Sequence, residues 1–174
     1  NVQNNAISGI SGGSTGAIIG IATNFDGGTT TVSGNEISTI TNGGAITGIS
    51  FGASGSGGAL TVNASQNFIL DLTGTGTAAV TGISVGGAVS TIKNIFRNKI
   101  YNLQNSNVGV STSGTVNGIL VLSGTTVNVF NNLVGDLRAP NSNGSDIIRG
   151  LSVTSTTTSS AINASFNSIY LNAS

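Results

Sequence analysis

The chain has 174 residues, yet only five are Lys or Arg and five are Asp or Glu, so the net charge is zero and the surface must be built mainly from Ser, Thr, Asn and Gly. So few cations cannot make the basic surface that neutralises phosphates, and we do not expect a nucleic-acid partner. Because Cys and His are absent, disulfides, thiol nucleophiles, imidazole bases and most transition-metal ligands are excluded, and we expect no metal and no cofactor. No apolar run approaches the roughly 18 residues of a membrane helix, so no membrane insertion is expected.

An asparagine recurs along the whole chain, each time followed two residues later by Ile or Val. Its spacings are 30, 32, 31, 34 and 35 residues, a range that is typical of solenoids and other repeat folds. We predict that the repeated amides stack as a structural ladder, and that each of these asparagines occupies a turn, where its backbone can be left-handed. The six residues are Asn5, Asn35, Asn67, Asn98, Asn132 and Asn167.

The first expected strand of each unit precedes this asparagine. The residue three places before it is apolar in every copy, whereas the residue four places before it is polar, as the period of two in a strand requires. The apolar row is Val2, Val32, Ala64, Ile95, Val129 and Ala164, and the polar row is Thr31, Asn63, Asn94, Asn128 and Asn163.

The second expected strand follows the asparagine, with aliphatic residues two and five places after it. The row at five places is Ile10, Ile40, Leu72, Leu103 and Leu137, and the sixth copy breaks the row at Asn172. The third expected strand centres on a glycine between two aliphatic residues, which indicates a bend, a bulge or a close backbone approach. These structural glycines are Gly20, Gly48, Gly82, Gly118 and Gly150.

No segment keeps helical apolar spacing over ten or more positions, and β-branched residues favour strands. The sequence therefore predicts an all-β parallel β-helix of about 5–6 coils of roughly 31 residues, with three short strands per coil. Stacked at strand spacing, six ladder positions span about 24 Å. We expect residues 1–174 to be a single β-helix segment of a longer repeat protein, because no polar capping unit is visible, and we expect further coils of the same polypeptide or end-to-end copies as partners.

Asp71 and Asp136 are the candidate carboxylate pair, because both stand four residues after a ladder asparagine, two coils apart with Asn102 between them. Their expected separation of about 9.6 Å lies near the upper limit for an inverting glycosidase. The competing interpretation is that Asp at this place forms a turn. We take the turn interpretation as the leading one and carry the catalytic interpretation as the alternative.

Other polar and aromatic residues give weaker patterns. Lys93, Arg97 and Lys99 cluster in the fourth coil, and Arg138 and Arg149 fall in the fifth. We expect a solvated surface, and the alternative is a mild basic strip opposite the acids. Tyr101 and Tyr170 share a register that could stack sugars. The outward Thr residues would suit an ice-binding face, but the Asn-rich row predicts an asparagine face instead. Four Asn-x-Ser patterns, at Asn63, Asn143, Asn163 and Asn172, are what chance supplies in such a composition.

The units Asn98–Leu103, Val116–Ile119, Asn132–Pro140 and Phe166–Leu171 resemble right-handed, pectin-lyase-like β-helix repeats of very large cell-surface proteins of Bacteroidota exported by the type IX secretion system. The resemblance implies right-handed coils and an extracellular location. It favours a non-catalytic structural or adhesive segment of a cell-surface protein or filament, a stiff polar rod that contacts surfaces or glycans. The alternative that it leaves open is a carbohydrate-active β-helix with Asp71 and Asp136 as its carboxylates.

Overall fold

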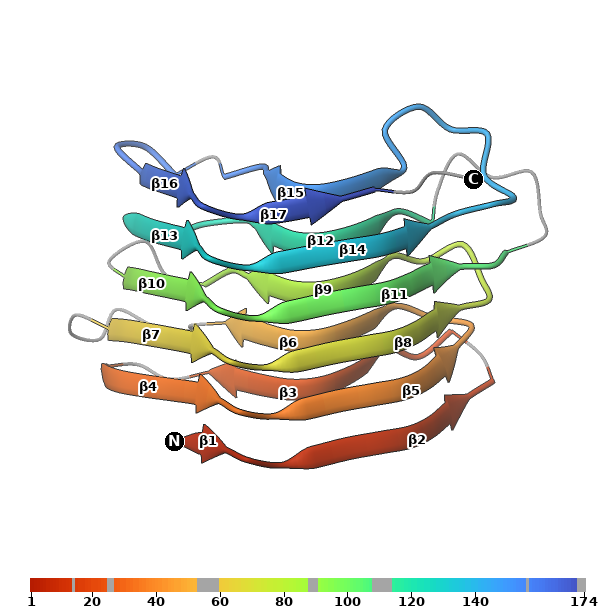
Figure 1. Cartoon of the computed structure of the whole chain (residues 1–174), viewed down its shortest axis with the longest axis horizontal. Helices are drawn as coiled ribbons and strands as arrows, with labels where there is room; N and C mark the ends of the chain where they lie inside the picture. Colours follow the sequence, from red (N-terminus) through yellow and green to blue (C-terminus); the bar gives the residue numbers. More distant parts are fainter. Residues whose placement is uncertain are drawn as a thin grey trace.

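A computed structural model describes residues 1–13, 15–24, 27–52, 60–87, 91–107, 114–155 and 157–171. Within these ranges every regular element is a strand, and the strands form three parallel sheets stacked as a solenoid of about five turns. Figure 1 shows the chain rising from the N-terminus in a right-handed coil, running along one sheet in front and returning along another behind. The predicted fold class is confirmed, including three strands per turn and a repeat of about 32 residues.

The three sheets take one strand each from successive coils. Sheet A contains β1 (Val2–Gln3), β4 (Gly28–Ser33), β7 (Leu60–Ser65), β10 (Thr91–Phe96), β13 (Thr126–Phe130) and β16 (Ala161–Ser165). Sheet B contains β2 (Ala6–Gly12), β5 (Glu36–Asn42), β8 (Phe68–Gly74), β11 (Lys99–Asn105), β14 (Leu133–Arg138) and β17 (Ser168–Tyr170). Sheet C contains β3 (Ile18–Asn24), β6 (Ile46–Gly52), β9 (Val80–Val85), β12 (Val116–Val121) and β15 (Ile148–Val153).

The core is a set of aliphatic columns that run up the inside of the coils. In sheet A the column at the predicted apolar position is in parallel register, with Val32 on Ala64 and Ile95 on Val129. The inner coils bury these side chains completely, whereas Ile10 and Ile169 in the outermost coils stay 36% and 43% exposed because each end coil has a neighbour on one side only. The predicted inward rows are therefore confirmed. The break predicted at Asn172 lies outside the described residues.

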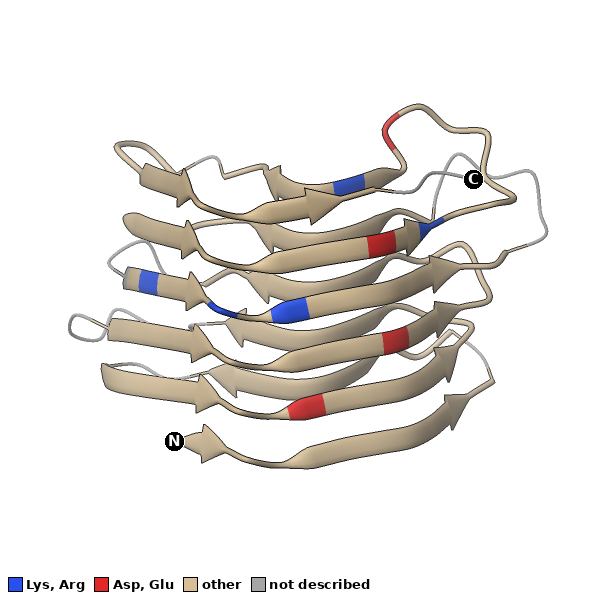
Figure 2. Cartoon of the chain, viewed as in Figure 1, with Lys and Arg blue, Asp and Glu red and all other residues tan. Residues whose placement is uncertain are grey.

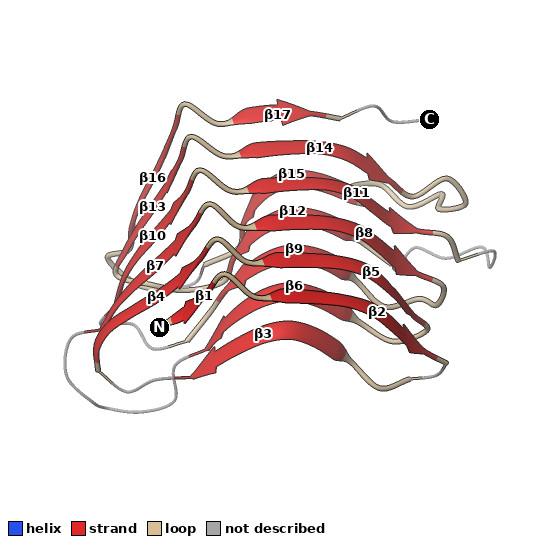
Figure 3. Cartoon of the chain, turned by 60° about the horizontal axis from the view of Figure 1, so that its bottom comes forward, coloured by secondary structure: helices blue, strands red, loops and turns tan. Residues whose placement is uncertain are grey.

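Sheets A and B meet at a sharp bend that recurs in every coil (Figure 3). The residue in the left-handed region there is the one before the ladder asparagine, for example Gln66 with φ 56° and Asn131 with φ 55°. Our expectation that the ladder asparagine itself takes this conformation is wrong. Asn4, Gly34 and Asn131 occupy the left-handed place at low steric cost, which leaves the next residue free to direct its amide inward.

A second left-handed residue lies in the middle of each long strand of sheet B. Thr39, Asp71, Asn102 and Asp136 have φ between 51° and 55°, and Gly9 has φ 71°. The strand pairing skips this residue, as in Tyr101 on Leu70 followed directly by Leu103 on Leu72. The neighbouring strand skips its equivalent residue too, so the register is unbroken and each skipped residue forms a left-handed kink rather than a β-bulge. This kink explains how the positions two and five after the ladder asparagine can both face inward.

Candidate functional site

The ladder asparagines form one continuous chain of side-chain hydrogen bonds. In each step the Oδ1 of one asparagine accepts from both the main-chain N and the Nδ2 of the asparagine one coil earlier, at 3.0–3.1 Å and 2.9–3.0 Å. The Nδ2 of a ladder asparagine also donates to a main-chain carbonyl of the coil before its own, for example from Asn98 to Ala64 at 3.0 Å. Asn35, Asn67, Asn98 and Asn132 are almost fully buried. Because their side-chain amides are hydrogen-bonded to neighbouring coils inside the fold, these residues hold the coils together.

The structural glycines are required because no side chain fits at their positions. A Cβ at Gly48 would lie 2.7 Å from the carbonyl oxygen of Gly82 and 2.8 Å from Cγ2 of Ile69. Gly20 and Gly82 are confined by equivalent neighbours. These are the carbonyl oxygen of the glycine in the next coil and an isoleucine of sheet B across the core. The pairing of sheet C skips each glycine, as in Thr47 on Thr81 followed by Ile49 on Ile83. The glycines are therefore places of close backbone approach, one of the predicted causes. A bulge, another predicted cause, is absent from these strand pairs because the skipped glycines stand opposite one another.

The candidate carboxylates Asp71 and Asp136 lie in the row of left-handed kinks of sheet B. Asn102 donates its Nδ2 to Oδ1 of Asp71, and Arg138 donates to Oδ1 of Asn102. Arg138 also pairs through Nε with Oδ1 of Asp136 at 3.2 Å. The four side chains therefore form one network across three coils in which each carboxylate already has a partner. Asn, Asp and Gly tolerate a left-handed backbone, so the kink accounts for the register that the two aspartates share.

Lys93 departs from the predicted solvated surface, because only 1% of it is exposed. It occupies the inward row of sheet A, in register with Val62 and Val127. Its Nζ donates to the carbonyl oxygens of Gly86 and Ser123, the latter at 3.2 Å, and burial lowers the pKa of Lys93 to about 8. The expectation of a surface lysine is therefore wrong. The signal was present in the sequence, since Lys93 stands two residues before the inward Ile95.

The remaining cations do not gather in a basic strip. Arg149 forms a two-point ion pair with Asp146, with Nε to Oδ1 at 3.0 Å and Nη2 to Oδ2 at 2.8 Å, and the hydrogen bond lowers the pKa of Asp146. Lys99 lies over the ring of Phe68, 5.9 Å from its centroid. Figure 2 shows acidic and basic residues interspersed along the strands of sheet B.

The two predicted tyrosines do not make a continuous platform. Tyr101 packs edge-on against Phe68 with centroids 5.4 Å apart, and Gly135 separates it from Tyr170 in the parallel register. Sheet A instead carries a stacked pair that the sequence reasoning did not single out, Phe96 and Phe130, with centroids 5.0 Å apart and rings parallel within 1°.

The predicted asparagine face is present on the outside of sheet A. In each step of the outward row an Nδ2 donates to the Oδ1 of the asparagine one coil earlier at 2.9 Å, from Asn94 to Asn63, from Asn128 to Asn94 and from Asn163 to Asn128. Unlike the buried ladder, this row faces solvent, and each amide keeps one N–H and one lone pair for other contacts. The arrangement gives sheet A a neutral surface that repeats at strand spacing.

Two buried asparagines that the sequence reasoning missed support the bend between sheets B and C. Asn42 donates to the carbonyls of Gly16 and Ala45 at 2.6 and 3.2 Å, and Asn105 donates to those of Gly76 and Ala78 at 3.1 and 2.8 Å. Both stand seven residues after a ladder asparagine. The equivalent residues in the coils directly before them are Gly12 and Gly74. A Cβ at Gly12 would lie 2.5 Å from Oδ1 of Asn42, so the alternation of Asn and Gly makes room for the larger side chain.

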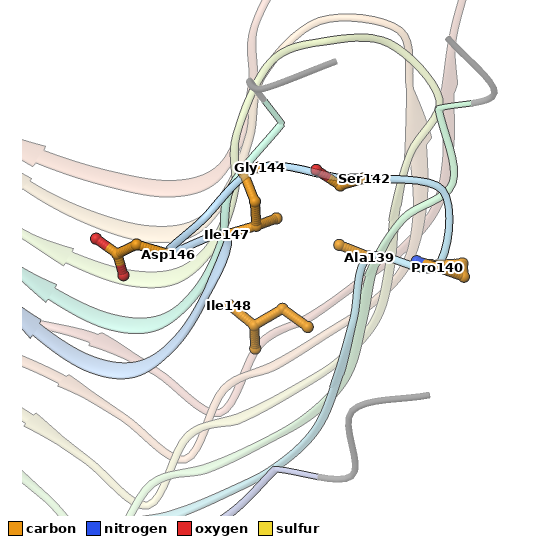
Figure 4. Close-up of a pocket in the computed structure, with 7 residues that line it drawn as sticks. All are labelled: Ala139, Pro140, Ser142, Gly144, Asp146, Ile147 and Ile148. Carbon is orange, nitrogen blue, oxygen red and sulfur yellow. The ribbon is translucent and has the colours of Figure 1, made fainter. Parts of the chain in front are cut away.

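The loop between β14 and β15 borders a hollow in the described surface. The hollow has a volume of about 410 Å³ and is lined by Ala139, Pro140, Ser142, Gly144, Asp146, Ile147 and Ile148 (Figure 4). Its single charged lining residue, Asp146, is paired with Arg149. Among the described residues no group of three or more Asp or Glu could hold a metal ion, and none forms a helix suited to crossing a membrane.

Comparison with known proteins yields no match, whether to family models, to curated proteins or to solved structures.

Proposed function

We propose that this chain is a non-catalytic structural or adhesive segment of an extracellular cell-surface protein or filament, acting as a stiff rod. The observation that carries the proposal is the buried asparagine ladder, which connects every described coil from Asn5 to Asn167. Amides stacked in this way, beside parallel strands that pair coil to coil, resist local opening and bending. Repeat solenoids of this kind present long surfaces and suit a mechanical or adhesive role.

The surface chemistry supports contact with neutral partners. Charges are few and interspersed, and the outer face of sheet A offers a periodic row of amides next to the stacked Phe96 and Phe130. Amides and aromatic edges complement hydroxylated chains better than they complement phosphates or lipids, so surface glycans are the ligands we propose. We further propose that the repeats belong with the pectin-lyase-like repeats of type IX-exported Bacteroidota proteins, whose coils the motifs around Asn98 and Asn132 resemble.

The proposed partners at the two ends are further coils of the same polypeptide or copies stacked end to end. The end strands of all three sheets, β1 and β16, β2 and β17, β3 and β15, each have a pairing strand on one side only among the described residues. A coil carrying an asparagine in ladder register would continue both the hydrogen bonds of Asn167 and the aliphatic columns. Open strand edges associate readily when a matching edge is supplied.

Electron microscopy of the protein isolated from its source tests the structural part of the proposal. We expect a continuous rod much longer than the roughly 24 Å that six ladder positions span at strand spacing. Compact isolated particles would contradict the rod. Binding to a panel of insoluble and soluble polysaccharides tests the adhesive part, and here we expect retention on at least one neutral glycan that is not cleaved during the incubation.

A further inference from the structure

Three Asn–Gly pairs occur in the sequence, Asn42–Gly43, Asn117–Gly118 and Asn143–Gly144. Asn–Gly is the pair in which the following main-chain nitrogen can most easily attack the side-chain amide, because glycine has no Cβ to hinder the approach and permits unusual backbone angles. From the sequence alone, the three pairs are therefore expected to be equally reactive. The fold places them in three different environments.

Asn42 is protected by its hydrogen bonds. It is 2% exposed at the end of β5, and its Nδ2 donates to the carbonyl oxygens of Gly16 and Ala45. Turning the side chain toward the nitrogen of Gly43 would break both bonds, which fasten the bend between sheets B and C. Reaction at Asn42 therefore needs prior local opening of the bend.

Asn117 is protected by the sheet. It is 2% exposed inside β12 and pairs in register with Thr81 on one side and Arg149 on the other. The following Gly118 is confined, since an added Cβ would collide with Val134 and with the carbonyl of Gly150. The extended backbone cannot fold into the five-membered ring that the attack requires while these strands stay paired.

Asn143 has neither protection. It is exposed and lies outside any strand, in the loop that encloses the hollow between β14 and β15 (Figure 4). In the described part of the chain no hydrogen bond holds its side chain, although Ser142 beside it closes a turn by donating its N–H to Ala139 at 3.1 Å. The pair Asn143–Gly144 can therefore reach the reactive geometry without unfolding any coil.

We propose that Asn143 is a site of spontaneous modification by its own backbone, and that the fold restricts the reaction to this pair. The nitrogen of Gly144 bonds to Cγ of Asn143 and loses its proton, and the side-chain nitrogen leaves as ammonia. Water then opens the resulting succinimide at one of its two carbonyls, giving aspartate or isoaspartate. Each event adds one carboxylate to the loop that carries Asp146 and, in the isoaspartate product, one extra backbone carbon.

The test is a time course of the full-length chain, folded, in mildly alkaline buffer at 37 °C, followed by peptide mass mapping and by release of ammonia. We expect conversion at Asn143 to be roughly a hundred-fold faster than at Asn42 or Asn117, because the latter two react only from locally open states. A parallel time course in concentrated urea should bring the three sites to similar rates, since it removes the protection but not the sequence.

Two variants serve as controls. Gly144→Ala should slow the reaction at position 143 by hindering ring closure, and Asn143→Gln should abolish it, because the longer side chain does not close the five-membered ring. Both changes lie in an exposed loop and should leave the unfolding temperature of the coils unaltered. Equal rates at the three pairs in the folded chain, or a rate at Asn143 as slow as that at Asn117, would overturn the proposal.

Discussion

The Oδ1 of Asn98 accepts two hydrogen bonds from Asn67, one from its main-chain N at 3.0 Å and one from its Nδ2 at 2.9 Å. A single buried amide oxygen thus satisfies a turn backbone and a side chain of the coil below it. Asn98 repeats the arrangement upward by donating its own N–H and Nδ2 to Asn132. The turn of each coil is therefore completed only by the next coil, which makes stacking part of the local structure.

Asn98→Ala should destabilise the chain by about 2–4 kcal/mol, because it removes the acceptor of the buried main-chain N–H of Asn67, one acceptor of the Nδ2 of Asn67 and a donor to the carbonyl of Ala64. Urea unfolding followed by circular dichroism measures the change. Asn94→Ala removes the same amide from the solvent-facing row and should cost less than about 1 kcal/mol. Equal effects at the two positions would contradict the structural role assigned to the buried ladder.

Gly82→Ala should destabilise by about 3 kcal/mol or more, because the added Cβ would lie 2.6 Å from the carbonyl oxygen of Gly118 and 2.7 Å from Cγ2 of Ile100. The matched control is Gly13→Ala, where an added Cβ meets nothing within 4 Å. Thermal unfolding of both variants separates the steric effect from the general effect of replacing glycine. A Gly82→Ala protein as stable as the control would show that the coils can separate at no cost.

Stability should increase as pH rises from about 8 toward the unperturbed lysine value of 10.5, because burial lowers the pKa of Lys93 to about 8. In this window the unfolded chain binds more protons than the folded chain, so deprotonation favours folding. The full difference corresponds to roughly 3 kcal/mol, a cost that is present below pH 8 and lost across the window.

Urea midpoints measured between pH 7 and 10.5 detect this rise, and Lys93→Met identifies its source. Among the described residues of β7, β9, β12 and β13, the strands around Lys93, there is no other titratable group. The Met variant should therefore flatten the profile while Lys99→Met leaves it intact. A rise that persists in Lys93→Met would assign the titration to another residue.

Replacing both Asp71 and Asp136 by Asn should leave stability within about 1 kcal/mol, because Asn also tolerates the left-handed backbone of the kink. Asp71→Val should cost about 1–3 kcal/mol, since a β-branched residue at φ 55° is strained. Any polysaccharide cleavage should be unchanged in the double Asn variant. Cleavage by the parent chain that disappears in this variant would favour the carbohydrate-active alternative.

Much of this protein follows from its sequence alone, because every coil repeats the same chemistry. The spacing of the ladder asparagines predicts the coil, the apolar residues three before and two after Asn67 predict two inward columns, and the invariant Gly82 predicts a close approach. Such features are local and recur from coil to coil. A sequence pattern that would be ambiguous in one coil becomes clear when it is repeated along the chain. The surface composition likewise predicted an asparagine face rather than a threonine one.

Only the tertiary structure decided how the residues that do not fit this pattern are accommodated. Inward positions two and five after the asparagine violate the period of two, and the left-handed kink at Asp71 resolves the conflict. Lys93 is tolerated in the core because carbonyls of two neighbouring coils, Gly86 and Ser123, receive its Nζ. Contacts between strands of neighbouring coils set these outcomes, such as the bond from Lys93 to Ser123, which is thirty positions away. The sequence pattern along the chain does not show which of these residues meet.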